Sequence, residues 1–171
     1  MGIDRDQDKL CPPEKLNSSH RTESFDSGNT QLDDWLKRRA LKNELERASR
    51  TYVVCVGEVV AYYCLANGAV AQTVATGRVR RNMPDPIPVM VIGRLAVDRH
   101  WQGKGIGHAL LRDAILRTLQ AAEIAGIRAI LVHAISEDAK QFYEMCGFTA
   151  SPIDPMILMV KVSDATASLS S

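Results

Sequence analysis

The sequence of 171 residues contains no apolar run long enough to cross a membrane and no N-terminal secretion signal. We therefore expect a cytoplasmic protein that does not enter membranes. The formal net charge is only +1, so the chain as a whole has no excess of one sign. Any contact with nucleic acid must then rest on a local basic surface and not on the overall charge.

Cysteine is scarce, and its placement argues against a metal site. The four cysteines are Cys11, Cys55, Cys64 and Cys146. They and the scattered histidines lack the short, regular spacings of zinc ligands, so we expect no metal. Cys55 and Cys64 lie in apolar, strand-like runs, which favours reduced, buried thiols over a disulfide.

The organisation predicted from composition is one domain between two polar ends. Residues 1–19 are polar, contain Pro12 and Pro13, and show no periodicity, so we expect a flexible leader. Residues 163–171 are rich in serine, alanine and threonine and are expected to form a disordered tail. Residues 20–162 then form a single domain of ordinary size.

Apolar periodicity predicts the elements of this domain. Ser27–Thr30 is a helix-start signal, and Leu32, Trp35 and Leu36 follow at helical spacing. Gly57 and Glu58 join two strand-like runs as a tight hairpin. The remaining expected strands are 21–25, 89–97, 128–135, 148–150 and 156–162; the expected helices are 106–125 and 138–146, with a long irregular connection over 67–88 that contains at most a short helix.

This order of elements is of the α+β class. The runs at 89–97 and 128–135 are apolar without alternation, which is typical of strands covered on both faces. We therefore predict a central mixed, mostly antiparallel sheet that is flanked by helices on both faces.

A glycine-rich loop, Gln102–Gly107, joins the strand at 89–97 to the helix that begins near Ile106. Such a loop can aim several backbone N–H groups, together with the positive end of the helix dipole, at a pyrophosphate. A nucleotide P-loop is excluded because His108 and Ala109 stand where lysine and serine or threonine are required. A dinucleotide fingerprint is excluded because its third glycine is replaced by His108. A simple helix-capping turn remains an alternative.

The remaining pattern, glutamine or arginine followed by two residues and then Gly-x-Gly, is matched by Gln102, Gly105 and Gly107. With the order of elements, it resembles the coenzyme A loop of the GNAT acetyltransferases. Three further segments resemble the GNAT toxins of type II toxin–antitoxin systems: Leu32–Leu36, Arg80–Pro88 and Arg94–Asp98. Ala139–Glu144, followed by Gly147 and Phe148, extends the match.

The resemblance implies a GNAT (acyl-CoA N-acyltransferase) fold and a toxin that transfers acetyl from acetyl-CoA to the α-amino group of aminoacyl-tRNA, which blocks translation. It also implies a homodimer and a neutralising antitoxin of ribbon-helix-helix type, with operator DNA bound only through that antitoxin. Two alternatives stay open: acetylation of a small amine or a protein N-terminus, and a non-catalytic acyl-CoA-sensing interaction domain.

By the same resemblance, residues of the strand, loop and later helix contact acetyl-CoA. These are Leu95, Ala96, Val97, Gln102, Gly103, Lys104, Gly105, Ile106, Gly107 and Phe142. Tyr143 is the expected general acid for the leaving thiolate, although a tyrosine there also fits ordinary packing. We expect Phe142 to face the core, with Tyr143 about 100° further round the helix.

The strand Val89–Val97 contains no Asp, Glu or His that could act as a general base. An α-amine has a pKa near 7.7–8.0, whereas that of lysine is about 10.4. Acetylation of the α-amine of an aminoacyl ester therefore depends less on a general base than acetylation of a lysine side chain does. Glu58, Glu137, Glu144 and His133 remain alternatives on other elements.

Basic residues gather in two places that would suit tRNA phosphates. Lys37 and Arg38 lie on the polar face of the first helix, and Arg78, Arg80 and Arg81 lie in the long connection. A solvated basic face is the plain alternative.

Overall fold

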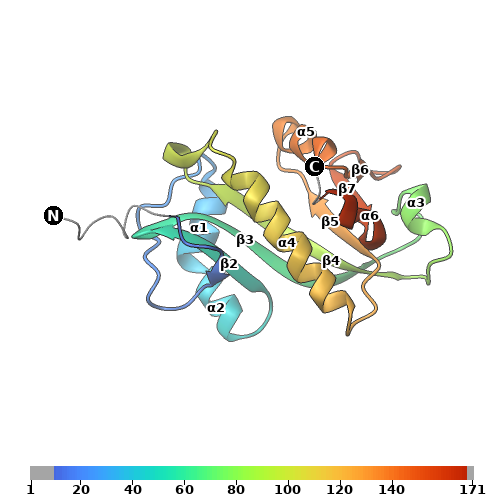
Figure 1. Ribbon diagram of the computed structural model, residues 1–171, viewed down its shortest axis with the longest axis horizontal. Coiled ribbons are helices and arrows are strands. Elements are labelled where there is room, and N and C mark those ends of the chain that lie inside the picture. The colour runs from blue at the N-terminus through green and yellow to red at the C-terminus, as the bar shows by residue number, and fades with distance from the viewer. Residues whose placement is uncertain (1–9, 169–171) are drawn as a thin grey trace. The chain divides into compact units, whose positions relative to one another are not determined.

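The computed structural model of the protein describes residues 10–168. The chain divides into two compact units. The first comprises the residues up to Leu65 together with Arg94–Asp113, and the second comprises Ala66–Gly93 and the chain from Ala114 onward. Figure 1 labels the helices and strands of both units.

The strands belong to a seven-stranded sheet in the order β1-β2-β3-β4-β5-β7-β6. Strand β4 pairs with β5 in parallel, whereas β1–β2, β2–β3, β5–β7 and β6–β7 are antiparallel. The mixed, mostly antiparallel sheet of an α+β protein is thereby confirmed. The strands are β1 (Glu14–Lys15), β2 (Arg50–Val56), β3 (Glu58–Val70), β4 (Ile87–Val97), β5 (Ala129–His133), β6 (Thr149–Ala150) and β7 (Ile157–Lys161).

Within residues 10–168, the helices expected after Ser27–Thr30, at 106–125 and at 138–146 are present together with shorter ones. They are α1 (Thr30–Arg38), α2 (Ala40–Leu45), α3 (Gly77–Arg80), α4 (Ile106–Ala122), α5 (Glu137–Met145) and α6 (Val162–Ser168), with a 3-10 turn η1 (Arg99–Trp101). None of these helices combines the length and the apolar character that a membrane span requires.

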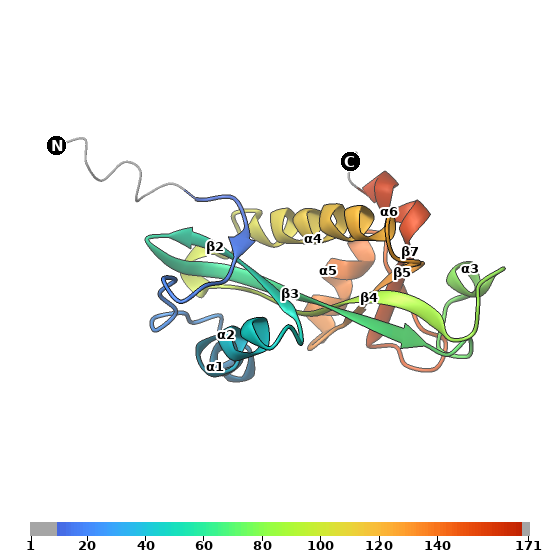
Figure 2. The same cartoon turned by 90° about the horizontal axis from the view of Figure 1, so that it is seen from below.

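In the first unit, α1 and α2 pack on one face of β2 and β3 (Figure 2). Helix α1 starts at Asn29, whose side chain accepts a hydrogen bond from the backbone N–H of Leu32. Trp35 and Leu36 on its inner stripe are buried against Tyr62 and Val53. The predicted hairpin is confirmed: Gly57, at φ +72°, joins β2 to β3.

In the second unit, β5 and β7 lie side by side and α6 follows β7 directly (Figure 1). The parallel register aligns Val89 with Ala129 and Ile92 with Val132. Residues of α3 and of the chain before it, such as Val79 and Ala75, pack on Val89 and Ala129 in one buried cluster. This burial explains why the two central strands are apolar without alternation.

Four expectations about elements differ from the structure. Residues 21–25 form a turn, in which the Phe25 N–H donates to Thr22 O, and not a strand. The strand at this edge is β1, inside the predicted flexible leader, where Leu16 is also buried. Strand β3 continues to Val70, into the predicted irregular connection.

The predicted tail likewise contains helix α6, whose Asp164 is bonded to Arg78. Local composition did not reveal these elements because a polar segment can be ordered by pairing with the rest of the fold. The leader and tail predictions for 1–9 and 169–171 lie outside the described residues.

Candidate active site

The glycine loop adopts a backbone that only glycine accepts readily. Gly103 has φ +78° and Gly105 has φ +83°, both in the left-handed region. No atom lies within 4 Å of a Cβ built on either residue, so the backbone dihedral and not crowding requires glycine. The Ala109 N–H donates to Gly105 O at 3.1 Å, which opens α4 directly after the loop. The start of α4 therefore follows the loop directly, and the N–H groups at the start of a helix suit an anion.

Gln102 ties this loop to two other segments. Its side-chain Nε2 donates to Val97 O at 2.8 Å and to Ser27 O at 3.0 Å. The first contact joins the loop to the end of β4, and the second joins it to the turn before α1. Gln102 therefore positions the loop through its own side chain, and these two contacts use no backbone N–H group of the loop.

Asp98 fixes the turn between β4 and the loop. Its carboxylate accepts hydrogen bonds from the backbone N–H groups of His100 at 2.9 Å and Asp26 at 3.0 Å, and contacts His100 Nδ1 at 3.1 Å. Burial by itself raises the pKa of this carboxyl, but the hydrogen bonds outweigh it and hold the pKa below its usual value. Asp98 is therefore a charged anchor of the turn.

The remaining predicted loop residues differ in their exposure to solvent. Lys104 is exposed, and its Nζ lies 4.9 Å from the centre of the Trp101 ring. Ile106 is buried at 5% exposure, whereas Gly107 is partly buried. Lys104 is thus the cation of the loop, and Trp101 braces it.

Strand β4 brings its last residues to the start of this loop. Ala96 is buried in the cluster that contains Trp35 and Tyr62, whereas Leu95 and Val97 are partly exposed. The side chains of these three residues are apolar, so the groups that they offer to a ligand for hydrogen bonding are backbone N–H and C=O groups.

Tyr143 and Phe142 lie on α5, in the second unit. The expectation for Phe142 was wrong: Tyr143 is buried at 8% exposure, whereas Phe142 is only partly buried. Gly147 turns the chain at φ +96°, and the Phe148 N–H donates back to Tyr143 O at 3.1 Å. The Phe148 ring consequently packs 5.7 Å from that of Tyr143, which centres the buried stripe on Tyr143.

The basic residues differ in how free they are. Lys37 and Arg38 are exposed at the end of α1. Arg78, in contrast, is paired with Asp164 of α6, with Nη2 and Oδ1 2.7 Å apart. This pairing raises the pKa of Arg78 and lowers that of Asp164. Arg80 and Arg81 are exposed and have no ion-pair partner within the part of the chain that the structure describes.

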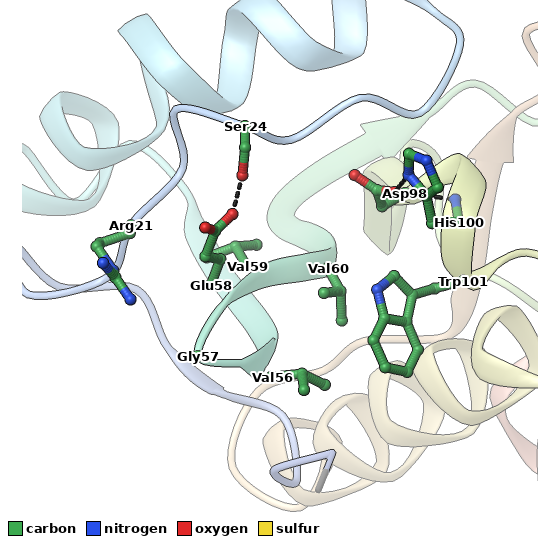
Figure 3. A pocket seen from close by; sticks show the side chains of 10 residues that line it. All are labelled: Arg21, Ser24, Val56, Gly57, Glu58, Val59, Val60, Asp98, His100 and Trp101. Carbon is green, nitrogen blue, oxygen red and sulfur yellow. Dashed lines mark hydrogen bonds and ion pairs between the residues drawn. The ribbon is translucent and has the colours of Figure 1, made fainter. Parts of the chain in front are cut away.

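The alternative bases lie on elements other than β4: Glu58 on β3, His133 on β5, and Glu137 and Glu144 on α5. Glu137, Glu144 and His133 are exposed. Glu58 is bonded to Ser24 at the mouth of a pocket of about 420 Å³, shown in Figure 3. Trp101 and His100 line the side of this pocket opposite Arg21. The pocket belongs to the tip of the β2–β3 hairpin and to η1, and the sequence had not indicated it.

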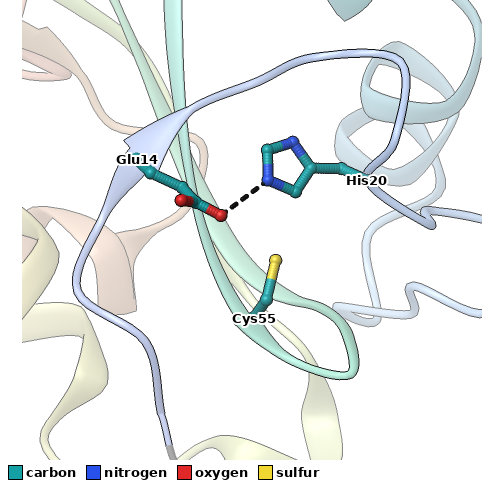
Figure 4. Close-up of side chains that lie close together, drawn as sticks. All are labelled: Glu14, His20 and Cys55. Carbon is teal, nitrogen blue, oxygen red and sulfur yellow. Dashed lines mark hydrogen bonds and ion pairs between the residues drawn. The ribbon is translucent and has the colours of Figure 1, made fainter.

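One group of metal-ligand types, Glu14, His20 and Cys55, lies together beside β1 and β2 (Figure 4). Glu14 Oε1 is 2.7 Å from His20 Nε2, and the Asn17 N–H donates to His20 Nδ1 at 3.0 Å. Because Nδ1 is an acceptor, neutral His20 carries its proton on Nε2, which has no lone pair left for a metal. Burial raises the pKa of the Cys55 thiol to about 11. Glu14 and His20 therefore hold the N-terminal segment together by hydrogen bonds, beside Cys55 of β2.

The structure adds one arrangement that the sequence reading missed. The Arg94 guanidinium lies over the Trp35 ring, with Cζ 4.3 Å from the ring centre. Arg94 directly precedes the expected cofactor contacts Leu95, Ala96 and Val97. Its place in the Arg94–Asp98 block was the only available signal, since nothing in the sequence connects it to Trp35.

Comparison with known proteins agrees with this geometry. Residues 47–150 match the family model described as an acetyltransferase (GNAT) domain. The chain is 51% identical to the "tRNA-acetylating toxin" of Mycobacterium tuberculosis (strain ATCC 25618 / H37Rv) over 91% of this chain and 94% of that relative.

Two solved structures extend the comparison. The fold resembles that of AtaT complexed with acetyl-methionyl-tRNAfMet, with a TM-score of 0.85 and 24% identity over 93% of this chain and 98% of that chain. It also resembles AtaTR bound with AcCoA, with a TM-score of 0.80 and 25% identity over 94% of this chain and 98% of that chain. The matched domain, the sequence identity and the shared fold together show that this chain belongs to the GNAT family of acetyltransferases.

Proposed function

We propose that this protein is the toxin of a type II toxin–antitoxin system and transfers the acetyl group of acetyl-CoA to the α-amino group of aminoacyl-tRNA. The observation that carries the proposal is the 51% identity to a relative named tRNA-acetylating toxin, which extends over 91% of this chain. An acetylated α-amine can no longer attack a peptidyl ester, so the modified tRNA cannot accept the growing chain and translation stops.

The composition of β4 supports an α-amine as the acceptor. Residues Val89–Val97 contain no carboxylate or imidazole. An α-amine, with a pKa near 7.7–8.0, is substantially neutral at physiological pH, whereas lysine is almost wholly protonated. Such an amine can release its proton to water, so the reaction does not depend on a base in this strand.

The residues assigned to acetyl-CoA lie on β4, on the glycine loop with the start of α4, and on α5. The backbone of Gly103, Lys104, Gly105, Ile106 and Gly107 takes the pyrophosphate, with Gln102 holding the loop in place. The backbone of Leu95, Ala96 and Val97 takes the pantetheine arm and faces the thioester carbonyl, where an N–H group stabilises the developing oxyanion. Phe142 adds an apolar contact to the cofactor.

Tyr143 is assigned as the general acid. The amine nitrogen bonds to the thioester carbon, the carbon–sulfur bond breaks, and the Tyr143 hydroxyl gives its proton to the departing thiolate. Water takes the proton that the amine loses, so the charges balance, and solvent later restores the tyrosine.

Binding of the tRNA is assigned to the exposed basic residues Lys37, Arg38, Arg80 and Arg81. Arg78, which is paired with Asp164, is assigned a smaller contribution. Binding of phosphates by these residues would weaken with salt, as expected when counterions are released. The remaining proposals follow from family membership: a homodimer in the cytoplasm, neutralised by a ribbon-helix-helix antitoxin that alone contacts operator DNA.

The deciding experiment incubates the purified protein with labelled acetyl-CoA and a mixed pool of charged tRNAs. We expect label on the aminoacyl group of one or a few tRNAs, and none on uncharged tRNA. Label on free amines or protein N-termini, with charged tRNA untouched, would instead support the small-amine alternative. Transfer to no acceptor would support a non-catalytic acyl-CoA-binding domain.

A further inference from the structure

We propose that Arg94, stacked on Trp35, binds a backbone phosphate in the single-stranded acceptor end of the aminoacyl-tRNA. This inference rests on the proposed function and names a contact point for its substrate. Every residue that carries it belongs to the first unit of the chain.

Arg94 is held in place by a rigid aromatic stack. Its Cζ lies 4.3 Å from the centre of the Trp35 ring, and Trp35 in turn stacks on Tyr62 at 5.9 Å with an interplanar angle of 11°. The Tyr62 hydroxyl donates to Leu32 O of α1 at 2.6 Å. Because Trp35 and Tyr62 are buried, they offer the Arg94 guanidinium a fixed aromatic surface before any ligand arrives.

The donors of Arg94 are nevertheless unused. Within residues 10–168, no hydrogen bond or ion pair engages its guanidinium, which is partly exposed. On α1, Asp33 uses its Oδ1 to accept hydrogen bonds from Ser27 N at 3.0 Å and Ser27 Oγ at 2.7 Å, and no ion pair joins it to Arg94 within residues 10–168. A fixed cation with free donors is suited to an anionic ligand that arrives from solution.

The shape of the group favours a phosphate. A guanidinium is planar, so two of its N–H groups can bind two oxygens of a phosphate together. Phosphates of a flexible single strand can adapt to such a point more readily than those of a duplex.

The position of Arg94 favours the acceptor end of the tRNA. Arg94 precedes Leu95–Val97, the segment assigned to the thioester, along β4. Trp35 lies on α1, which also carries the exposed Lys37 and Arg38. The stack therefore connects the strand at the proposed reaction centre to the helix of the proposed tRNA surface.

The test compares Arg94→Ala and Arg94→Lys with Arg112→Ala, which removes an exposed arginine from α4 and serves as the charge-matched control. Each protein is assayed for kcat/KM with a charged tRNA, with an amino acid ethyl ester that has no phosphate, and with acetyl-CoA. Thermal unfolding checks each fold. If Arg94→Ala does not fold, Arg94→Lys keeps the comparison, because lysine retains the stem and the charge without the planar pair of donors.

We expect Arg94→Ala to lower kcat/KM for charged tRNA by about 10- to 100-fold, the range of a lost hydrogen bond to a charged group. The kcat/KM for the ester and the KM for acetyl-CoA stay unchanged. The kcat/KM of Arg94→Lys for charged tRNA lies between those of wild type and Arg94→Ala. The dependence of log kcat/KM on log salt becomes shallower by about 0.7, as for one phosphate of a single strand. Arg112→Ala behaves as wild type.

Three results overturn the site: equal losses on the tRNA and on the ester, a loss confined to acetyl-CoA, which would place a donor phosphate at Arg94, or no loss at all. Failure of the proposed function looks different, because wild-type protein would then leave charged tRNA unacetylated. If wild-type protein acetylates charged tRNA and Arg94→Ala does so equally well, only the phosphate site is overturned.

Discussion

The side chain of Gln102 reaches back to the strand that precedes it, with Nε2 2.8 Å from the carbonyl oxygen of Val97. The last residue of β4 and the first residue of the glycine loop are thereby joined without using any backbone donor of the loop. This contact makes the geometry of the proposed pyrophosphate site dependent on one amide side chain.

Replacement of Gln102 should therefore act on the donor substrate. Gln102→Ala removes the bonds to Val97 O and Ser27 O and lowers stability by roughly 1 kcal/mol, since each such bond contributes about 0.5–1.5 kcal/mol and the residue is exposed. Gln102→Glu places a carboxylate against both carbonyl oxygens and should be worse. Steady-state kinetics should show a raised KM for acetyl-CoA, and an unchanged KM would contradict the positioning role.

The loop glycines allow a test with an internal control. Gly103→Ala and Gly105→Ala force a side chain into the left-handed region, at a cost of about 1–2 kcal/mol each. Gly57→Ala at the β2–β3 hairpin imposes the same kind of strain, with equally open space around its Cβ. Chemical denaturation should show similar losses for all three, whereas only the two loop variants should weaken acetyl-CoA binding measured by calorimetry.

Tyr143→Phe should separate chemistry from folding. The buried ring keeps its packing on Phe142 and Phe148, so we expect an unfolding midpoint close to that of wild type. Loss of the proton donor should lower kcat by about 10²–10⁴-fold without raising either KM. Tyr62→Phe is the matched control: it removes the bond to Leu32 O and should reduce stability more than turnover. Wild-type turnover in Tyr143→Phe would remove Tyr143 from the mechanism.

Arg78 should contribute less to tRNA binding than its neighbours. Its guanidinium is already neutralised by Asp164, whereas Arg80 and Arg81 are exposed. Arg80→Ala or Arg81→Ala should each reduce the salt slope of tRNA binding by about 0.7–0.9, and Arg78→Ala should change it little. Asp164→Asn releases Arg78 and should steepen the slope in fluorescence titrations. Equal effects of all three arginine variants would show that the ion pair opens on binding.

The Cys55 thiol should make stability depend on pH in alkaline solution. Burial raises its pKa from 9.0 to about 11, so the folded protein holds a proton that the unfolded chain releases. The stabilising effect is complete below pH 9 and is lost as the pH rises toward 11. Denaturant titrations across this range should show a shallower decline for Cys55→Ala. Some decline remains, because burial also raises the pKa of the Tyr62 hydroxyl. If the free energy of unfolding of Cys55→Ala falls with pH as steeply as that of wild type, the Cys55 thiol is not the titrating group.

Much of the fold was predictable because its signals are local. The hairpin at Gly57, the cap at Asn29 and the glycine loop each depend on a few adjacent residues. Strand β1 was not predictable, since a polar two-residue strand is ordered only by its pairing with β2. The orientation of α5 depends on where Phe148 returns to Tyr143, and periodicity alone misplaced it by one residue. Arg94 and Trp35 meet only through packing of α1 on the sheet, which no spacing encodes.

Strand β1 has a practical consequence for anyone who shortens this chain. Glu14 and Lys15 pair with Val53 and Tyr52 along the outer edge of β2. Removing residues 1–19 as a dispensable leader would expose those backbone groups of β2 and take away Glu14, which lies beside Cys55 and His20. An uncovered strand edge readily pairs with another molecule, so a trimmed protein should self-associate. Strand β1 thus protects the outer edge of β2 against pairing with another molecule.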